Sequence, residues 1–599
     1  MNDLDYGIIG NCRSAALISK TGSIDWCCLP EFDSSSIFAK ILDTKIGGSF
    51  EINVGHDYKI TQRYLENTSI LITTFSNGND IFEVHDFMPR YIKPEGSPYT
   101  PPEIIRYIRI KSGKPEFTVK YDPKLEYAQD ETINYVKKDY IVSLTNTRKF
   151  DTQYLYSNFS LDAVANGKPI LLTGDGFFLT SYNEKLFQPT LDKIHIDYER
   201  TKVYWLNWSE KTPSYQQYNQ QISRSVITLK LLTYEKTGAV LAAVTTSLPE
   251  TIGEVRNWDY RFCWVRDASM VVKVLANLGH KNMAKSYLQF IIDIIPDKDE
   301  KLQIMYGINK EKNLTEEFLE HLEGYHGSRP VRIGNAAFTQ KQNDIYGILM
   351  DVIHQQFMHF STDKENGEEM WNITKGIAWV VQQHWQERDK GIWEFRTEER
   401  HFTFSKVLCW TAIDRAIKVA EILGKHSKAE KWKPLEQAIK KDIMDNAWNE
   451  QVQAFTQSYG SPDLDASVLL MESYGIIEAM DPRFVSTVKA IEKELSNDGL
   501  LYRYKNKDDF GLPSSSFTIC TLWFINSLFR IGECRRAESL FKQLLSYGNH
   551  LGLFSEDIDF KTKRLLGNFP QAYSHLAIIE TAVSLSQITH EEKVIDAMR

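Results

Sequence analysis

The sequence predicts a multidomain β plus α fold, with an antiparallel β-sandwich over residues 1–210 and a helical domain over residues 211–599. The length of 599 residues is too great for one ordinary hydrophobic core, so at least two domains are expected. In the first part, apolar residues alternate with polar ones between turn signals, which is typical of strands. From about residue 214 onward, the apolar spacing becomes helical.

The N-terminal part consists of short alternating segments separated by turns. The clearest segments are 50–54, 58–65, 81–87 and 116–121, and the turn signals include Thr21-Gly22, Asn77-Gly78 and Asn166-Gly167. The stretch 92–103, rich in Pro and Gly, predicts a long loop inside this part, because strand-like residues resume at 104–110. An antiparallel sandwich follows from this pattern.

In the helical part, three segments resemble one another, namely 274–291, 419–437 and 528–545. Each has an apolar helix end, a glycine placed to close the helix in the left-handed conformation, a polar turn and a second helix. Their spacing along the chain is unequal, which suits helical hairpins closed into a ring with long inserted loops. We expect the chemistry in those loops, at one mouth of the ring.

The composition narrows the range of partners. A net charge of −9 gives no electrostatic reason to expect nucleic acid or an anionic membrane as a partner. Aromatic residues make up 12% of the chain, and aromatic faces commonly line sugar sites. A neutral small-molecule carbohydrate is therefore the expected ligand.

The N-terminus and the cysteines predict a cytoplasmic location. The first twenty residues carry acids before any base and no sustained apolar segment, which is unlike a signal peptide. No apolar run is long enough to span a bilayer. The seven cysteines are odd in number and form no C-x-x-C pair, which argues against a disulfide framework or a zinc site. We expect buried free thiols, no metal and no organic cofactor.

Two glutamates are the candidate catalytic acids. Glu394 lies in a Gly-Ile-Trp-Glu turn next to Trp393, and an apolar neighbour raises the pKa of a carboxyl group, as a general acid requires. Glu556 lies in the unusual stretch 551–560. Cleavage of a glycosidic bond needs two carboxyl groups that face each other. The alternative interpretation of the Gly-Ile-Trp-Glu turn is that Trp393 is a core residue and Glu394 an ordinary surface acid.

The segment 253–269 alternates charged and aromatic residues just before an apolar helix. Within it, Arg266 and Asp267 form a typical pair for orienting sugar hydroxyls, with Trp258 nearby. The alternative for Asp267 is a helix N-cap. The spacing alone leaves both interpretations open.

Two further loops carry directed polar groups. The segment 324–344 contains Arg329 among several donors, and 401–410 places His401, Ser405 and Lys406 after the candidate acid. The Ser-Lys pair comes without a G-x-S-x-G pattern, so packing or ligand orientation is favoured over a nucleophile. Neither a Gly-rich phosphate cradle nor an H-E-x-x-H or EF-hand pattern occurs.

As a set, five stretches resemble glycoside hydrolase family 15 of bacterial or archaeal type, which holds glucoamylases, glucodextranases and trehalases. They are residues 6–34, residues 255–268, the GSRPVRIGNAA loop, GIWE followed by RHFTFSK, and SEDID followed by GNFPQAYSHL. The resemblance covers nearly the whole chain. This chain departs from the family pattern at Ser514–Ser516, where Glu and Gly are expected. The departure affects whatever this loop contributes to substrate choice.

The resemblance implies a trehalase-like β-supersandwich joined by a helical linker to an (α/α)6 barrel. It implies that Glu394 is the general acid, that Glu556 is the general base, and that Arg266 and Asp267 hold the glucose at the cleaved end. It further implies that the pocket is lined by Trp258, Arg329, Trp393, His401 and Lys406.

We expect an inverting, exo-acting α-glucoside hydrolase of glucoamylase type, which acts on small α-glucans or disaccharides. Trehalase activity is the alternative within the family, and the choice depends on the pocket beyond the first sugar. A disaccharide phosphorylase is more remote, because phosphate would attack directly and no base such as Glu556 would be needed. A non-catalytic glycan-binding protein would have lost the two acids.

Overall fold

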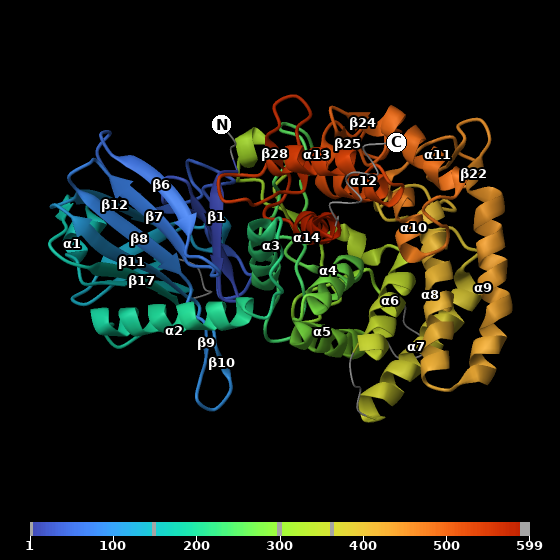
Figure 1. Ribbon diagram of the computed structural model, residues 1–599. Coiled ribbons are helices and arrows are strands. Elements are labelled where there is room, and N and C mark those ends of the chain that lie inside the picture. The colour runs from blue at the N-terminus through green and yellow to red at the C-terminus, as the bar shows by residue number, and fades with distance from the viewer. Residues whose placement is uncertain (1–3, 146–150, 296–301, 360–363, 588–599) are drawn as a thin grey trace.

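The computed structural model describes residues 4–145, 151–295, 302–359 and 364–587, and it has two parts (Figure 1). A β-sandwich with one long helix along it forms the first part, and a ring of helices forms the second. Among the described residues, none of the helices combines the length and apolar character that a membrane crossing requires.

Two antiparallel sheets form the sandwich. Within the described ranges, the first has seven strands, in the order β1-β2-β3-β5-β12-β16 with β4 paired to β3, and the second has eight, in the order β13-β14-β15-β17-β11-β8-β7-β6. The strands of the first sheet are β1 (Tyr6–Gly10), β2 (Ala15–Ser19), β3 (Ile24–Cys28), β4 (Ser36–Phe38), β5 (Ser49–Asn53), β12 (Glu116–Asp122) and β16 (Ile170–Leu171). Those of the second are β6 (Lys59–Tyr64), β7 (Leu71–Ser76), β8 (Ile81–Phe87), β11 (Glu103–Ser112), β13 (Thr132–Val136), β14 (Ile141–Thr145), β15 (Thr152–Ser157) and β17 (Gly176–Tyr182).

The sheets bury three apolar faces. Between them, Phe50 of the first sheet meets Phe178 of the second with ring centroids 5.5 Å apart. The outer face of the second sheet is covered by α2 (Leu191–Ser209), through Ile194 and Tyr198. The outer face of the first sheet packs on the helical part, where the Trp26 indole N–H donates to the Val244 carbonyl at 2.8 Å. The alternating pattern thus predicted the strands correctly.

Two details of the first part differ from expectation. The stretch 92–103 is not a plain loop, because β9 (Tyr91–Ile92) and β10 (Pro98–Tyr99) pair to form a small hairpin that projects from the sandwich (Figure 1). The helical pattern also starts earlier, since α2 begins at Leu191 and a short α1 (Leu161–Ala165) precedes it. The expected boundary at residues 210 and 211 follows the end of α2, and it stays a prediction.

The second part is a closed ring of helical pairs. In the described residues, six inner positions follow in the order α4, α6, α8, α10 with its preceding 3-10 turn, α12 and α14, which packs back on α4. The helices are α3 (Asn219–Leu231), α4 (Val265–Asn277), α5 (Lys281–Ile294), α6 (Asp344–His359), α7 (Lys364–His384), α8 (Thr403–Ile422), α9 (His426–Asn446), α10 (Met471–Tyr474), α11 (Pro482–Leu495), α12 (Thr518–Arg530), α13 (Cys534–Leu545) and α14 (Ala572–Ser586).

The glycines of the three similar segments close their helices as predicted. Gly279, Gly424 and Gly532 follow α4, α8 and α12, with φ of 93°, 67° and 89°. Only glycine adopts this left-handed region without a steric cost, so each inner helix stops there and turns into its outer partner. Six of the seven cysteines are buried free thiols, as predicted, and the seventh, Cys534, is half-buried.

A buried arginine joins the two parts. Arg261 donates to both carboxylate oxygens of Asp259, at 2.9 and 2.7 Å. It also donates to the Tyr127 hydroxyl at 2.8 Å and to the Ser34 carbonyl at 2.9 Å, both in the sandwich. Because Arg261 and Asp259 are at most 1% exposed, removal of either partner would leave a buried charge.

Arg261→Met should therefore lower the free energy of unfolding by about 3–5 kcal/mol, as loss of one partner of a buried ion pair does. Denaturant or thermal unfolding measures the change. The matched control is Arg63→Met, which breaks an ion pair to Glu83 from a side chain that is 57% exposed and should cost about 0–1 kcal/mol. Equal losses in the two variants would contradict the structural role of Arg261.

Candidate active site

A pocket lies at the N-terminal ends of the inner helices. Its wall includes Arg266 and Asp267 from the first turn of α4, Phe517 just before α12, and Tyr573 from the first turn of α14. The remaining wall comes from loops, and both candidate acids belong to it. The pocket thus lies at one mouth of the ring, where the inserted loops led us to expect the chemistry.

Glu394 is held in a tight turn. Its own φ is 60° and that of Gly391 is 64°, and a Cβ on Gly391 would stand 2.7 Å from the Phe402 ring. The indole N–H of Trp264 donates to Glu394 Oε1 at 2.7 Å. Burial raises the pKa of Glu394, and the Arg266 guanidinium, 3.9 Å away, opposes that rise. A raised pKa suits a group that must donate a proton.

The neighbouring indole is not the expected one. Trp393 lines the pocket, but its N–H donates to Asp465 at 2.8 Å and its ring packs on Phe517. Trp264, which is distant in sequence, provides the indole that bonds to Glu394. Sequence adjacency suggested the wrong tryptophan because the turn points Trp393 and Glu394 in different directions.

Glu556 stands just before β27 (Asp557–Ile558) and is 1% exposed. The Tyr260 hydroxyl donates to its Oε1 at 2.5 Å, whereas its Oε2 is buried and has no hydrogen-bond partner among the described residues. A Cβ on Gly567 would stand 2.8 Å from that Oε2. Gly567 therefore gives the carboxyl group its space, and Oε2 keeps lone pairs that no described residue uses.

Acidic neighbours surround Glu556. Burial and the negative charge of Glu250 raise its pKa, and the Arg503 guanidinium opposes them. Arg503 is itself held by Glu250 at 2.8 Å. Asp557 accepts from the Ser515 hydroxyl at 2.9 Å, and burial next to Glu556 raises its pKa as well. The buried Arg503 guanidinium thus lies among three carboxyl groups, those of Glu250, Glu556 and Asp557.

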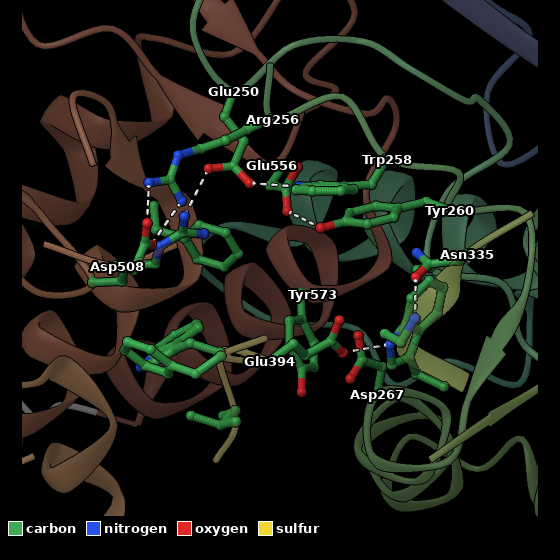
Figure 2. Close-up of a pocket in the computed structure, with 18 of the residues that line it drawn as sticks. Glu250, Arg256, Trp258, Tyr260, Asp267, Asn335, Glu394, Asp508, Glu556 and Tyr573 are labelled. Carbon is green, nitrogen blue, oxygen red and sulfur yellow. Dashed lines mark hydrogen bonds and ion pairs between the residues drawn. The ribbon is translucent and has the colours of Figure 1, made fainter. Parts of the chain in front are cut away.

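The two acids are separated by the aromatic residues that hold them. Tyr260 bonds to Glu556 and Trp264 bonds to Glu394, and the rings of these two residues meet edge to face with centroids 5.3 Å apart. Figure 2 shows the two carboxyl groups on different walls of the pocket. This arrangement leaves space between them for a substrate.

Arg266 and Asp267 form a buried polar cluster on the floor. Arg266 donates to Asp267 at 3.1 Å, to the Tyr573 hydroxyl at 2.9 Å and to Gln342 and Asp344 at 2.9 and 3.1 Å. Asp267 is not the N-cap of α4, because Trp264 holds that position and Asp267 lies within the first turn. The helix-cap alternative is therefore wrong, and the pair faces the pocket.

The outer wall carries charged pairs around Trp258. Arg256 donates to both oxygens of Asp508, at 2.8 and 2.6 Å. The Trp258 indole N–H donates to Glu250 at 3.2 Å, and the Arg332 and Arg396 guanidinium groups lie 4.5 and 4.7 Å from its ring centroid. These contacts fix the ring at the edge of the pocket (Figure 2).

Three expected pocket residues lie elsewhere. Arg329 is exposed, and Arg332, three residues later in the same loop, reaches the pocket region instead. Lys406 is 2% exposed and donates to the backbone carbonyls of Trp385 and Glu387, just after α7 ends. His401 stacks on Tyr459, with centroids 5.8 Å apart. None of the three is part of the pocket wall that the described residues form.

Several site residues were not predicted, among them Glu250, Tyr260, Trp264, Arg503, Asp508 and Gly567. Tyr260 and Trp264 belong to the aromatic-rich segment 253–269, so their density was a usable signal. Glu250 and Arg503 lie 253 positions apart and have no local pattern, so only the folded chain brings them together.

Comparisons with known proteins agree with this geometry. Residues 216–583 match the family described as "Glycosyl hydrolases family 15", and residues 5–148 match "Trehalase-like, N-terminal". The chain belongs to glycosyl hydrolase family 15. It is accordingly a glycoside hydrolase, as the motifs predicted.

Family 15 relatives match over almost the full chain. A protein named "Trehalase" from Thermoplasma volcanium is 36% identical over 594 residues, covering 97% of this chain and 93% of the relative. Another "Trehalase", from Mycolicibacterium smegmatis, is 36% identical over 617 residues, covering 98% and 92%. A crystal structure of a bacterial glucoamylase complexed with acarbose superposes with a TM-score of 0.71 at 13% identity, covering 100% and 96%, and it confirms the sandwich and (α/α)6 barrel.

The two acids should fail in different ways. Glu394→Gln and Glu556→Gln should each lower kcat by about 10²–10⁴-fold, because each removes a positioned proton-transfer group. A glucoside with a good leaving group needs little protonation, so it should partly rescue Glu394→Gln only. Steady-state kinetics on both substrates measure this. Glu387→Gln, an exposed position in the same segment, is the control and should remain active. Equal rescue in both variants would show that the roles are misassigned.

The pH profile should depend on Glu250. If Glu556 is the general base, it must be ionised, and kcat/KM should fall as pH falls through the pKa of Glu556. Glu250→Gln removes a charge that raises this pKa, so the acid limb should move to lower pH by about one unit. Glu316→Gln is the control, since this carboxylate pairs with Arg332 and Arg396 instead. A shift of equal size in the control would contradict the assignment.

Proposed function

We propose that this family 15 enzyme is a trehalase, which hydrolyses α,α-trehalose to two glucose molecules with inversion at the attacked carbon. The observation that carries the proposal is the pair of buried carboxyl groups, each held by its own aromatic donor on either side of one pocket. The similarity to relatives named "Trehalase", over nearly the whole of both chains, supports the choice of substrate.

In the proposed mechanism, one glucose unit lies on the pocket floor against Arg266 and Asp267. The Glu394 carboxyl gives its proton to the glycosidic oxygen as the bond from that oxygen to C1 breaks. A water on the opposite face bonds to C1 and loses a proton to Glu556 Oε2. Inverting enzymes place the carboxyl groups about 6.5–9.5 Å apart to admit that water. The gap bridged by Tyr260 and Trp264 supports this route over direct attack by Glu556.

The outer wall supports a short substrate. Two hydrogen bonds join Arg256 to Asp508 and one joins Arg503 to Glu250, so fixed charges stand where a longer chain would continue. Such groups can bond to the hydroxyls of a second glucose.

The glucoamylase-like activity favoured by the sequence is the second candidate. The similarity to a bacterial glucoamylase concerns the fold alone at 13% identity, whereas the relatives at 36% identity are named for trehalose. The comparisons therefore support the trehalase alternative better. A phosphorylase is disfavoured because Glu556 would have no role as a base.

The products of trehalose should carry the signature of inversion. The attacked unit becomes β-glucose and the leaving unit stays α-glucose, so proton NMR in the first minutes should show equal amounts of both anomers. In ¹⁸O-labelled water, the label should enter the β-anomer only. Two α-glucose molecules at the start would indicate a double displacement through a glycosyl-enzyme intermediate, and the base assignment of Glu556 would fall.

The same assay separates the candidate substrates. Measured kcat/KM for trehalose should exceed that for maltose and isomaltose by at least about tenfold, equivalent to ~1.4 kcal/mol. A higher kcat/KM for maltose than for trehalose would favour the glucoamylase-like alternative. Product formation that requires phosphate and yields glucose 1-phosphate would establish a phosphorylase instead.

A further inference from the structure

A second cavity lies in the ring of helices, away from the catalytic pocket. Residues from α4, α6, α10, α12 and α14 line it. On α4 it uses Lys273 and Asn277, whereas the catalytic pocket uses Arg266 and Asp267. At 1.5 Å per residue, Asn277 lies roughly 16 Å along the helix from Arg266. We call this the far-end cavity, because it lies toward the C-terminal ends of the inner helices.

The far-end cavity contains polar atoms that the protein leaves unpaired. The Trp523 indole N–H and Asn526 Oδ1 are buried and have no hydrogen-bond partner in the part of the chain that the structure describes. Trp523 is 2% exposed. An unpaired buried polar group costs about 1–3 kcal/mol, so two of them in one cavity are a reason to expect a ligand that pairs with them.

The charges of the far-end cavity are balanced. Lys273 and Arg415 both hold Asp351, at 2.7 and 2.8 Å, and Arg530 lies 3.9 Å from Glu472. Glu580 also lines the cavity, and burial raises its pKa, which favours its neutral form. No group of three or more His, Cys, Asp or Glu side chains in the described ranges is placed to hold a metal. A neutral ligand therefore fits better than an ion.

The rest of the wall combines hydroxyl and amide groups with apolar surface. Ser269, Ser527 and Ser584 line the cavity together with Asn277, and the aliphatic side chains of Val274 and Ile579 stand between them. A sugar ring presents hydroxyl groups at its edge and C–H groups on its faces. This mixture of acceptors, donors and apolar patches is the kind that binds such a ring.

We propose that the far-end cavity is a second saccharide-binding site, which takes a neutral mono- or disaccharide through its hydroxyl groups. The site does not depend on which disaccharide the catalytic pocket cleaves. Trp523 also connects it to that pocket, because its ring lies 6.2 Å from that of Trp393, the residue before the acid. An occupant that accepts the Trp523 N–H thus contacts a side chain that supports the catalytic wall.

Equilibrium dialysis of labelled glucose against the full-length enzyme tests the proposal. The wild-type chain should bind one glucose molecule more than Ser584→Trp, which fills the cavity from a half-buried position on α14. Gln587→Trp is the matched control. It is exposed at the C-cap of the same helix, three residues after Ser584, and should bind as many glucose molecules as the wild-type chain. Ser584→Trp should keep the wild-type kcat/KM at low substrate concentration.

A second variant covers the case in which Ser584→Trp folds poorly. Asn526→Leu keeps the volume and removes the unpaired acceptor, so it too should bind one glucose fewer than the wild-type chain. Asp267→Asn should lose the glucose held at Arg266 and Asp267 and retain the far-end one. Wild-type stoichiometry in both cavity variants, at concentrations that saturate the catalytic pocket, would overturn the proposal.

The outcomes separate this site from the proposed activity. If the enzyme does not cleave trehalose, but Asp267→Asn binds one glucose more than the double variant Asp267→Asn, Ser584→Trp, the result supports the far-end site and contradicts the trehalase proposal. If trehalose is cleaved and Ser584→Trp binds as many glucose molecules as the wild-type chain, the result supports the trehalase proposal and contradicts the far-end site.

Discussion

The buried pair of Arg261 and Asp259 is the interaction on which the site depends. Both side chains lie in the segment that also carries Tyr260 and Trp264, which donate to Glu556 and Glu394. Arg261 is anchored to the sandwich through Tyr127 and Ser34. The sandwich therefore helps to position the residues that hold the proposed acid and base, although it contributes no residue to the pocket wall among those described.

Burial acts on both Glu394 and Glu556, and the neighbouring donors and charges determine how the two carboxyl groups differ. Burial raises the pKa of Glu394 and of Glu556. For an acid this is useful by itself, because the proton is retained until the leaving oxygen needs it. The proposed base must be ionised, and the Tyr260 hydroxyl and Arg503 both stabilise the charge of Glu556 against the nearby Glu250. Arg503 also donates to Glu250 at 2.8 Å, so the two carboxyl groups share one guanidinium.

Local signals in the sequence predicted the framework well and the pocket wall less well. Alternation and glycine turns located the strands, and Gly279, Gly424 and Gly532 ended the helices where the pattern required. The two glutamates also came to one pocket. Arg329 and Arg332 show why some pocket-wall residues were predicted wrongly. The two side chains have the same chemistry and lie three positions apart in one loop, so only the path of the backbone decides which one turns inward.

The direction of the inner helices explains why this ring tolerates so many buried acids at one mouth. The inner helices α4, α12 and α14 all begin at the catalytic pocket, and the first turn of a helix carries partial positive charge from its unpaired N–H groups. Asp267 lies in such a turn, and the backbone carbonyl of Glu556 accepts from the N–H of Thr518, the first residue of α12, at 3.0 Å. The opposite end of a helix carries partial negative charge, and Arg530 lies in the last turn of α12, 3.9 Å from Glu472. The first turn of α4 and the last turn of α12 thus each carry a side chain whose charge is opposite to that of the helix end.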